Sequence, residues 1–284
     1  MKAKIWLGVG LASVIPLAGA AGHQTRLMAA AAQPQTAATG RDTCVADRPH
    51  PAPCDRVQGG EQGEGRIDLL YGAAPEAALM TQLRLIRGHL HVGCELVRAG
   101  LFDDSLAHFH HPIEEIYATV EAELEARGVP LRAELEALTR AAAARQGGEA
   151  FVAAYDAAVA AVARAEETIP KSERMSLGLN LDVAVRLLRQ AMVEYRDAFV
   201  DGELANVIEY QDARGFVWQA SELFEAAAAQ LKQRDAKVFA DVELTLAELR
   251  KAWPSALPPD RIVKSYVAVR GLISLIEYKT LGFR

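Results

Sequence analysis

The stretch PEAALMTQLRLIRGHLHVGCELVR, residues 75–98, shows the helical periodicity on which the fold of the chain rests. Its apolar residues recur every three or four positions, whereas Glu95 and the arginines fall on the other side. This spacing predicts a helix with one buried stripe, which stops before Gly100. The stripe consists of Leu79, Leu83, Ile86, Leu90, Gly93 and Val97.

Helical patterns of this kind follow one another to the end of the chain, without an alternating β-type run of useful length. Alanine is abundant and aromatic residues make up only 6%, which favours closely packed helices. The links are short, so consecutive helices should be antiparallel neighbours. We predict an all-α bundle of seven to eight mostly antiparallel helices with up-and-down connections. The further helices are expected over residues 104–127, 130–147, 149–168, 173–200, 203–234, 236–253 and 258–280.

Residues 1–20 have the pattern of a Sec signal peptide. Lys2 and Lys4 precede an apolar core at residues 5–17, and Ala18-Gly19-Ala20 supplies the cleavage pattern. An uncleaved membrane anchor is the alternative, but the core is short for a span and contains a proline. We therefore expect a Sec-exported protein of the periplasm or the extracellular space, with no membrane span in the mature chain.

Residues 21–72 are rich in Ala, Gln, Thr, Gly and Pro and lack a sustained period. We predict a flexible lead here, followed by a helical domain over residues 73–284. In an oxidising compartment Cys44 and Cys54 are expected to form a local disulfide. Cys94 is then left as a buried free thiol.

The net charge of −6 argues against nucleic acid or an anionic membrane surface as the main partner, because both need a basic patch. The chain also contains no GxSxG, P-loop, HExxH or CxxCH motif, and no GxGxxG after a strand. The sequence therefore gives no support for the enzyme and cofactor classes that these motifs mark.

Side chains that bind metals or move protons are concentrated in residues 88–117, which hold five of the seven histidines. His89 falls on the apolar stripe of its helix, whereas His91 falls on the polar face and should be solvated. Gly88 and Gly93 flank His89 within a helix, where glycine costs roughly 1 kcal/mol relative to alanine. These glycines indicate that something approaches the backbone closely, and close helix–helix packing is one explanation.

The next expected helix carries His108, His111 and Glu115 on one face, within about 60° of one another at 100° per residue. Two imidazoles and a carboxylate on successive turns can converge on one cation. Pro112 interrupts this set and predicts a kink or a new helix start after His111. His110 lies nearer the apolar side and is expected to pack.

A second acidic element lies far along the chain, in the expected helix over residues 203–234. Asp212 falls inside the apolar stripe of this helix, and Glu209 lies one turn earlier at the edge of the stripe. A buried carboxylate needs a partner, because burying an isolated charge is very costly. A metal ion is one candidate. A buried ion pair is the other, with Arg186, Arg189, Arg196 or Arg214.

We therefore predict a secreted or periplasmic protein that binds a transition-metal ion for uptake, storage or sensing. Mixed imidazole and carboxylate ligands suit iron, zinc, manganese or copper. The predicted partners are the metal ion and a membrane permease or another periplasmic protein, with no nucleic acid. The predicted ligands are His89, His108, His111, Glu115, Glu209 and Asp212.

Two other functions compete with this one. The histidines could pack and hydrogen-bond between helices in a non-metal interaction or structural protein. Two histidines and a carboxylate with open positions could also serve a metal-dependent oxidase, although we favour a protein that is not an enzyme. No residue is assigned a catalytic role.

A signal peptide followed by a helical domain with a His/Glu motif resembles the architecture of imelysin-type periplasmic proteins linked to iron uptake. The signature of that family is GxHxxE, whereas this chain has HFHHPIEE with no glycine two residues before the histidine. The resemblance thus concerns architecture and compartment, and no residue is carried over from it.

Overall fold

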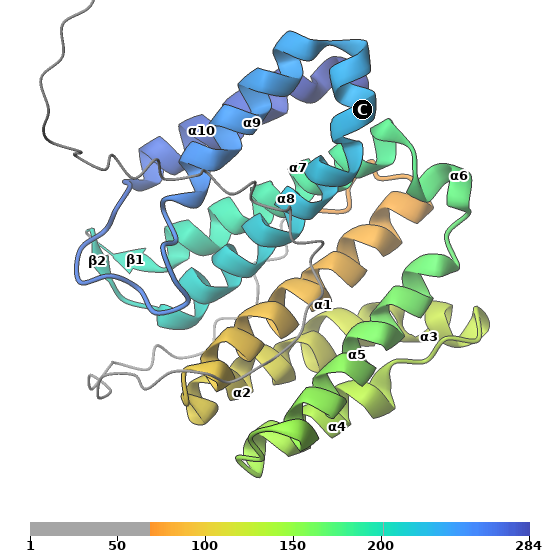
Figure 1. Cartoon of the computed structure of the whole chain (residues 1–284), viewed down its shortest axis with the longest axis vertical. Helices are drawn as coiled ribbons and strands as arrows, with labels where there is room; N and C mark the ends of the chain where they lie inside the picture. The colour runs from red at the N-terminus through yellow and green to blue at the C-terminus, as the bar shows by residue number, and fades with distance from the viewer. Residues whose placement is uncertain (1–68, 201) are drawn as a thin grey trace, which may run out of the picture. The chain divides into compact units, whose positions relative to one another are not determined.

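The computed structural model describes residues 69–200 and 202–284, which form an almost entirely helical structure (Figure 1). The predicted all-α fold class is confirmed. The predicted signal peptide, nearly all of the lead, and Cys44 and Cys54 lie outside the described residues. The α-helices are α1 (Pro75–Arg98), α2 (Phe102–His111), α3 (Ala118–Ala126), α4 (Arg132–Ala143), α5 (Glu149–Glu167), α6 (Lys171–Arg174), α7 (Leu177–Asp197), α8 (Val207–Arg234), α9 (Ala236–Arg250) and α10 (Tyr266–Thr280).

Helix α1 contacts other helices on both of its sides. It packs against α7 and α8 on one side and against α2 and α5 on the other. Helices α7, α8, α9 and α10 pack against one another in sequence, and α10 returns to α7, so that these four form a bundle (Figure 1). Because α2 also contacts α8, the helices α1, α2 and α8 meet at one place.

The π-helical turn η1 (Pro112–Tyr117) joins α2 to α3. The residues from α2 to α3 therefore stay helical, but their winding changes directly after His111. Proline at this position lacks an N–H and crowds the preceding turn, which accounts for the change. Turns of this kind are frequent at functional sites.

Several expected helix boundaries differ from the structure, and two of the differences arise because a serine side chain caps a new helix start. The predicted helix over 173–200 is divided into α6 and α7, since the Ser176 side chain accepts a hydrogen bond from the Leu179 N–H and starts a new helix. A short antiparallel hairpin, β1 (Phe199–Val200) with β2 (Glu203–Leu204), replaces the ends of two predicted helices. Helix α10 starts after Ser265 rather than at residue 258, because the Ser265 side chain caps it.

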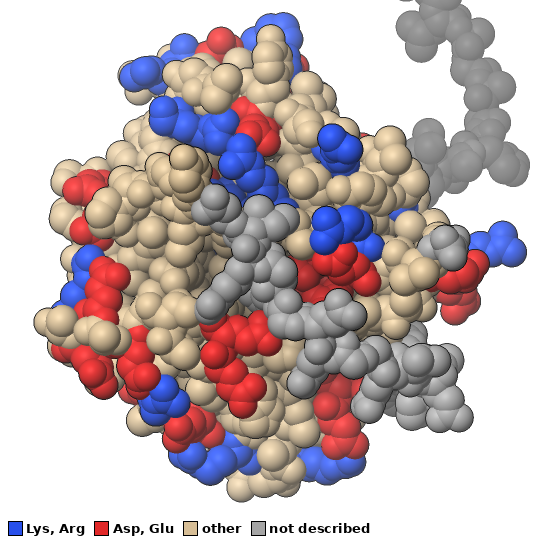
Figure 2. Space-filling model, turned by 180° about the vertical axis from the view of Figure 1, so that it is seen from behind, with Lys and Arg blue, Asp and Glu red and all other residues tan. Residues whose placement is uncertain are grey.

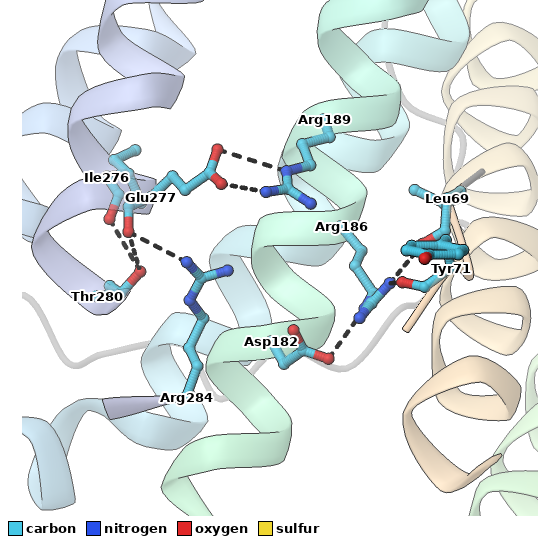
Figure 3. A network of polar contacts seen from close by, with 9 residues as sticks. All are labelled: Leu69, Tyr71, Asp182, Arg186, Arg189, Ile276, Glu277, Thr280 and Arg284. Atoms are coloured by element: carbon cyan, nitrogen blue, oxygen red, sulfur yellow. Dashed lines mark hydrogen bonds and ion pairs between the residues drawn. The ribbon is translucent and has the colours of Figure 1, made fainter. Parts of the chain in front are cut away.

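Buried Arg186 binds the residues that precede α1. It donates hydrogen bonds to the carbonyl oxygens of Leu69, at 2.6 Å, and Tyr71, at 3.4 Å, and it pairs with Asp182 (Figure 3). Arg189 pairs instead with Glu277 of α10 (Figure 3). These contacts use two of the arginines that could have neutralised Asp212.

Arg214, another of the four arginines that the sequence offered as partners of Asp212, links α8 to α1. Its side chain is 8% exposed and donates two hydrogen bonds of 2.7 Å to the carboxylate of Glu95. It also donates to the carbonyl oxygen of Trp253 at 2.6 Å and lies over the ring of Trp218. Burial would raise the pKa of Glu95, but the hydrogen bonds from Arg214 and the nearby imidazole of His91, whose Nε2 lies 3.6 Å from the carboxylate, lower it to about 2.

We expect the Arg214–Glu95 ion pair to make a contribution to stability that is lost in acid. A carboxyl with a lowered pKa stabilises the fold above the pKa of the unfolded chain, about 4.5, and loses that contribution as the pH falls toward 2. We expect the loss to reach about 3 kcal/mol. Urea unfolding at pH 5 and at pH 3, with chelator present, should show a larger drop for the wild type than for Glu95→Gln. Equal drops in the two proteins would contradict this assignment.

Cys94 is disulfide-bonded, so the expectation of a free thiol is wrong. Its partner lies outside the described residues, as do both members of the predicted Cys44–Cys54 pair. The sequence contains three cysteines, so these two disulfides cannot form together within one chain. Helical position predicted the burial of Cys94, but it could not reveal which cysteine would reach it.

Candidate metal centre

Glycines bring the three site-bearing helices unusually close. A Cβ atom on Gly215 of α8 would lie 2.3 Å from the carbonyl oxygen of Gly88 on α1. A Cβ atom on Gly93 would lie 2.6 Å from the ring of Phe109 and 3.3 Å from Cβ of His108 on α2. The glycines around His89 therefore serve close helix packing, which places the side chains of α1, α2 and α8 within direct contact.

His89, His108 and Asp212 meet at this contact, one from each helix. Nδ1 of His89 and Nδ1 of His108 each lie 2.8 Å from the same carboxylate oxygen, Oδ1 of Asp212. The three side chains are at most 1% exposed. They form a group whose potential ligand atoms all lie within 4.8 Å of one another. Two imidazoles and one carboxylate are a donor set that suits a transition-metal ion.

Gln211 fixes the orientation of the His108 ring. Its amide nitrogen donates to the carbonyl oxygen of Ala256 at 3.2 Å, so its oxygen Oε1 faces Nε2 of His108 at 2.8 Å. An oxygen acceptor here requires the proton of His108 to be on Nε2. A neutral His108 then turns the lone pair of Nδ1 toward Asp212. Two lone pairs at 2.8 Å repel unless a cation lies between them, either a proton or a metal ion.

The charge state of Asp212 agrees with a cation at this position. Burial would raise the pKa of Asp212, but the attraction of His89 and His108 and the hydrogen bond from His108 hold it well below its usual value. Asp212 is therefore an ionised carboxylate in a site closed to solvent. None of the arginines suggested by the sequence pairs with it, and its polar neighbours are the imidazoles of His89, His108 and His111.

His111 lies at the edge of this group. Its Nδ1 is 3.8 Å from Oδ2 of Asp212, beyond hydrogen-bond distance, and its ring lies edge-on to that of His89. Neither ring nitrogen has a hydrogen-bond partner, although both are buried. Burial lowers the pKa of His111, but the neighbouring Asp212 outweighs it and the pKa is raised. A buried imidazole with two unused nitrogens beside a carboxylate can become a further ligand.

The other two predicted ligands are not members of the group within 4.8 Å. Glu115 lies in η1 and acts electrostatically on His111. Glu209 accepts a hydrogen bond from Asn206, the residue that caps the start of α8. Its side chain therefore contacts the residue that caps the start of α8.

Two other expectations about histidines differ from the structure. His110 was expected to pack, but it is exposed. His91 was expected to be solvated, but its side chain is 21% exposed and lies beside Glu95. Sequence reasoning also missed Gln211, which directly precedes Asp212. The only available signal was a glutamine next to a carboxylate inside a buried helix face.

The fold and the site together define an all-α protein with a buried His/Asp cluster where three helices meet. Residues 170–281 match the family model of the iron permease-associated 4-helix bundle domain. The matched part contains α7–α10, so the bundle of these helices is similar to that domain. It includes Asp212 but not the three histidines of the site. This match indicates an iron-permease-related function.

No curated protein and no solved structure matches the chain. Within the described residues, no helix combines the length and the hydropathy that a membrane crossing needs.

Proposed function

We propose that this protein binds a transition-metal ion, with iron as its cargo, at His89, His108 and Asp212, and exchanges it with a membrane permease. The observation that carries the proposal is the position of two imidazole nitrogens, each 2.8 Å from one buried carboxylate oxygen. The outer contact from Gln211 supports it, since ligating histidines usually donate their second N–H to an oxygen acceptor.

The identity of the ion rests on the ligands together with the family match. Imidazole and carboxylate also suit zinc, manganese and copper, so the ligands alone do not select iron. The similarity of residues 170–281 to an iron permease-associated domain favours iron among these metals. The same similarity supports a permease as the partner. The signal-peptide pattern of residues 1–20 supports export, so we place the exchange outside the cytoplasm.

His111 supplies access to this cargo site. Among His89, His108 and His111, only His111 has an exposed part: 11% of its side chain is accessible, whereas the side chains of His89 and His108 are 0% exposed. We assign it as the further ligand that an incoming ion meets first. Uptake, storage and sensing all fit reversible binding here, and the permease match favours uptake.

A metal titration of the purified chain, without an affinity tag, tests this function. We expect saturable binding of Fe(II) under anaerobic conditions, with one ion per chain. Gln211→Met, which removes the contact to His108, should weaken binding by about 10- to 100-fold. Gln230→Met is the matched control, because Gln230 lies on the exposed side of the same helix, and it should bind as the wild type does.

The contradicting outcome is a wild-type protein that takes up neither Fe(II) nor zinc nor manganese at micromolar concentrations. The contacts of His89 and His108 with Asp212 would then serve only to hold the helices together.

A further inference from the structure

Helix α10 has an outer face that no other described element covers. At 100° per residue, five of its exposed positions fall within an arc of about 100°. None of these five residues is charged. They are Val267, Gly271, Ser274, Leu275 and Tyr278, and exposed Leu281 follows directly in the chain. The side chains of Val267 and Tyr278 are 76% and 74% exposed.

The inner face of α10 is apolar as well. Val269, Ile273 and Ile276 are buried against the bundle. A helix that is apolar on both faces is normally covered on both, by protein or by lipid. Its outer face is therefore a candidate contact surface.

Exposed apolar side chains are concentrated in this part of the molecule. Of the ten large hydrophobic residues that are exposed among the described residues, seven lie between Leu244 and Leu281. Single exposed hydrophobic residues are ordinary, but a concentration on one surface marks an interaction site. Ile262 and Val263, in the segment before α10, belong to this group.

The charge of this segment is opposite to that of the chain. Residues 261–284 contain five basic residues and one acidic residue, whereas the whole chain has a net charge of −6. Arg261 and Arg270 are exposed, and Arg270 borders the uncharged face. Figure 2 shows Lys and Arg side chains gathered with uncharged ones over the upper part of the molecule, where α9 and α10 lie in Figure 1. Most of the Asp and Glu side chains in that view lie lower down.

We propose that the outer face of α10, with Arg261 and Arg270, docks this protein on an anionic lipid bilayer surface. A helix that presents apolar side chains bordered by basic ones lies in the plane of the membrane interface, with the basic residues at the headgroups. Tyr278 suits this position because its ring is apolar and its hydroxyl is polar. The whole chain has a net charge of −6 and residues 261–284 have +4, so the remainder has −10. Anionic headgroups therefore attract this segment and repel the remainder.

This proposal is independent of metal binding, since it uses no residue of the metal centre. It also changes the expectation, drawn from the net charge, that an anionic membrane surface is not the main partner. The net charge of −6 describes the whole chain, whereas docking depends on the charge of the surface that touches the lipid.

Vesicle co-sedimentation of the full chain tests the proposal. We expect the wild type to pellet with vesicles of phosphatidylcholine containing about one third phosphatidylglycerol, and to pellet less with pure phosphatidylcholine. The triple substitution Val267→Ser/Tyr278→Ser/Leu281→Ser should weaken binding at least about tenfold. Arg261→Gln/Arg270→Gln should remove the preference for anionic vesicles and the sensitivity to salt.

Val200→Ser is the matched control, because Val200 is an exposed residue of the hairpin outside this face. All variants share the same N-terminal residues, so any binding through that region cancels in the comparison. Equal pelleting of the wild type and the triple variant would overturn the proposal, as would no pelleting of the wild type above a vesicle-free sample. Loss of a dimer in the triple variant, seen by sedimentation velocity, would show instead that a second copy covers the face.

Discussion

Asp212→Asn is expected to abolish the stabilisation of this protein by metal. The wild type should gain about 4 kcal/mol in free energy of unfolding when Fe(II) is present at a thousandfold excess over its dissociation constant. Asparagine keeps the shape of Asp212 but removes the charge that faces His89 and His108 at 2.8 Å. The variant should therefore show no change with added metal, as measured by urea unfolding with and without Fe(II).

The same substitution should also weaken the metal-free protein, by about 3 kcal/mol, because it breaks a buried ionic contact from one side. Asp241→Asn provides the matched control. Asp241 of α9 is half-buried and pairs with Lys237 and Lys279. It is not a member of the cluster. This control should keep the full response to metal. A metal response of wild-type size in Asp212→Asn would contradict the role given to this carboxylate.

Gly215→Ala should be the most damaging small substitution in the described chain. Its new Cβ would lie 2.3 Å from the oxygen and 2.7 Å from the carbon of the Gly88 carbonyl group. Both atoms belong to the backbone, so α1 and α8 must move apart. Overpacking of this kind costs about 1–3 kcal/mol, occasionally more. We expect a loss of at least about 2 kcal/mol in urea unfolding, together with weaker metal binding.

Gly271→Ala is the matched control for this substitution. Gly271 lies inside α10, and nothing is found within 4 Å of its added Cβ. Alanine should therefore stabilise the helix there by about 0.5–1 kcal/mol. The two Gly→Ala substitutions are thus expected to have opposite signs. A neutral Gly215→Ala would show that the close approach of the two helices does not hold the site together.

Helix geometry explains why part of the site could be predicted from sequence. His89 and Asp212 each stood out as polar residues on an apolar stripe, and the structure places them 2.8 Å apart. His108 and His111 shared a face that continued into alanines. Counting positions on one helix predicts which residues share a face, and burial then requires them to find partners.

What the sequence could not show was which faces of different helices meet. Glu209 shares a face with Asp212, but it lies one turn nearer the helix start and bonds to Asn206 instead. The side-chain oxygen of Gln211 faces His108 because the amide nitrogen of Gln211 donates to the carbonyl oxygen of Ala256. Ala256 lies in the segment after α9, so this contact also depends on how the helices pack. The pairing of Cys94 likewise depends on distance in space, which the spacing along the chain does not give.

The most direct test of the metal centre is a crystal structure of the metal-loaded chain with anomalous data at the iron absorption edge. We expect one anomalous peak within about 2.3 Å of Oδ1 of Asp212 and of one ring nitrogen each of His89 and His108. We also expect His108 to keep its contact to Gln211. Crystals grown with excess Fe(II) that show no peak there, with both imidazoles still hydrogen-bonded to Asp212, would contradict the assignment of a metal centre.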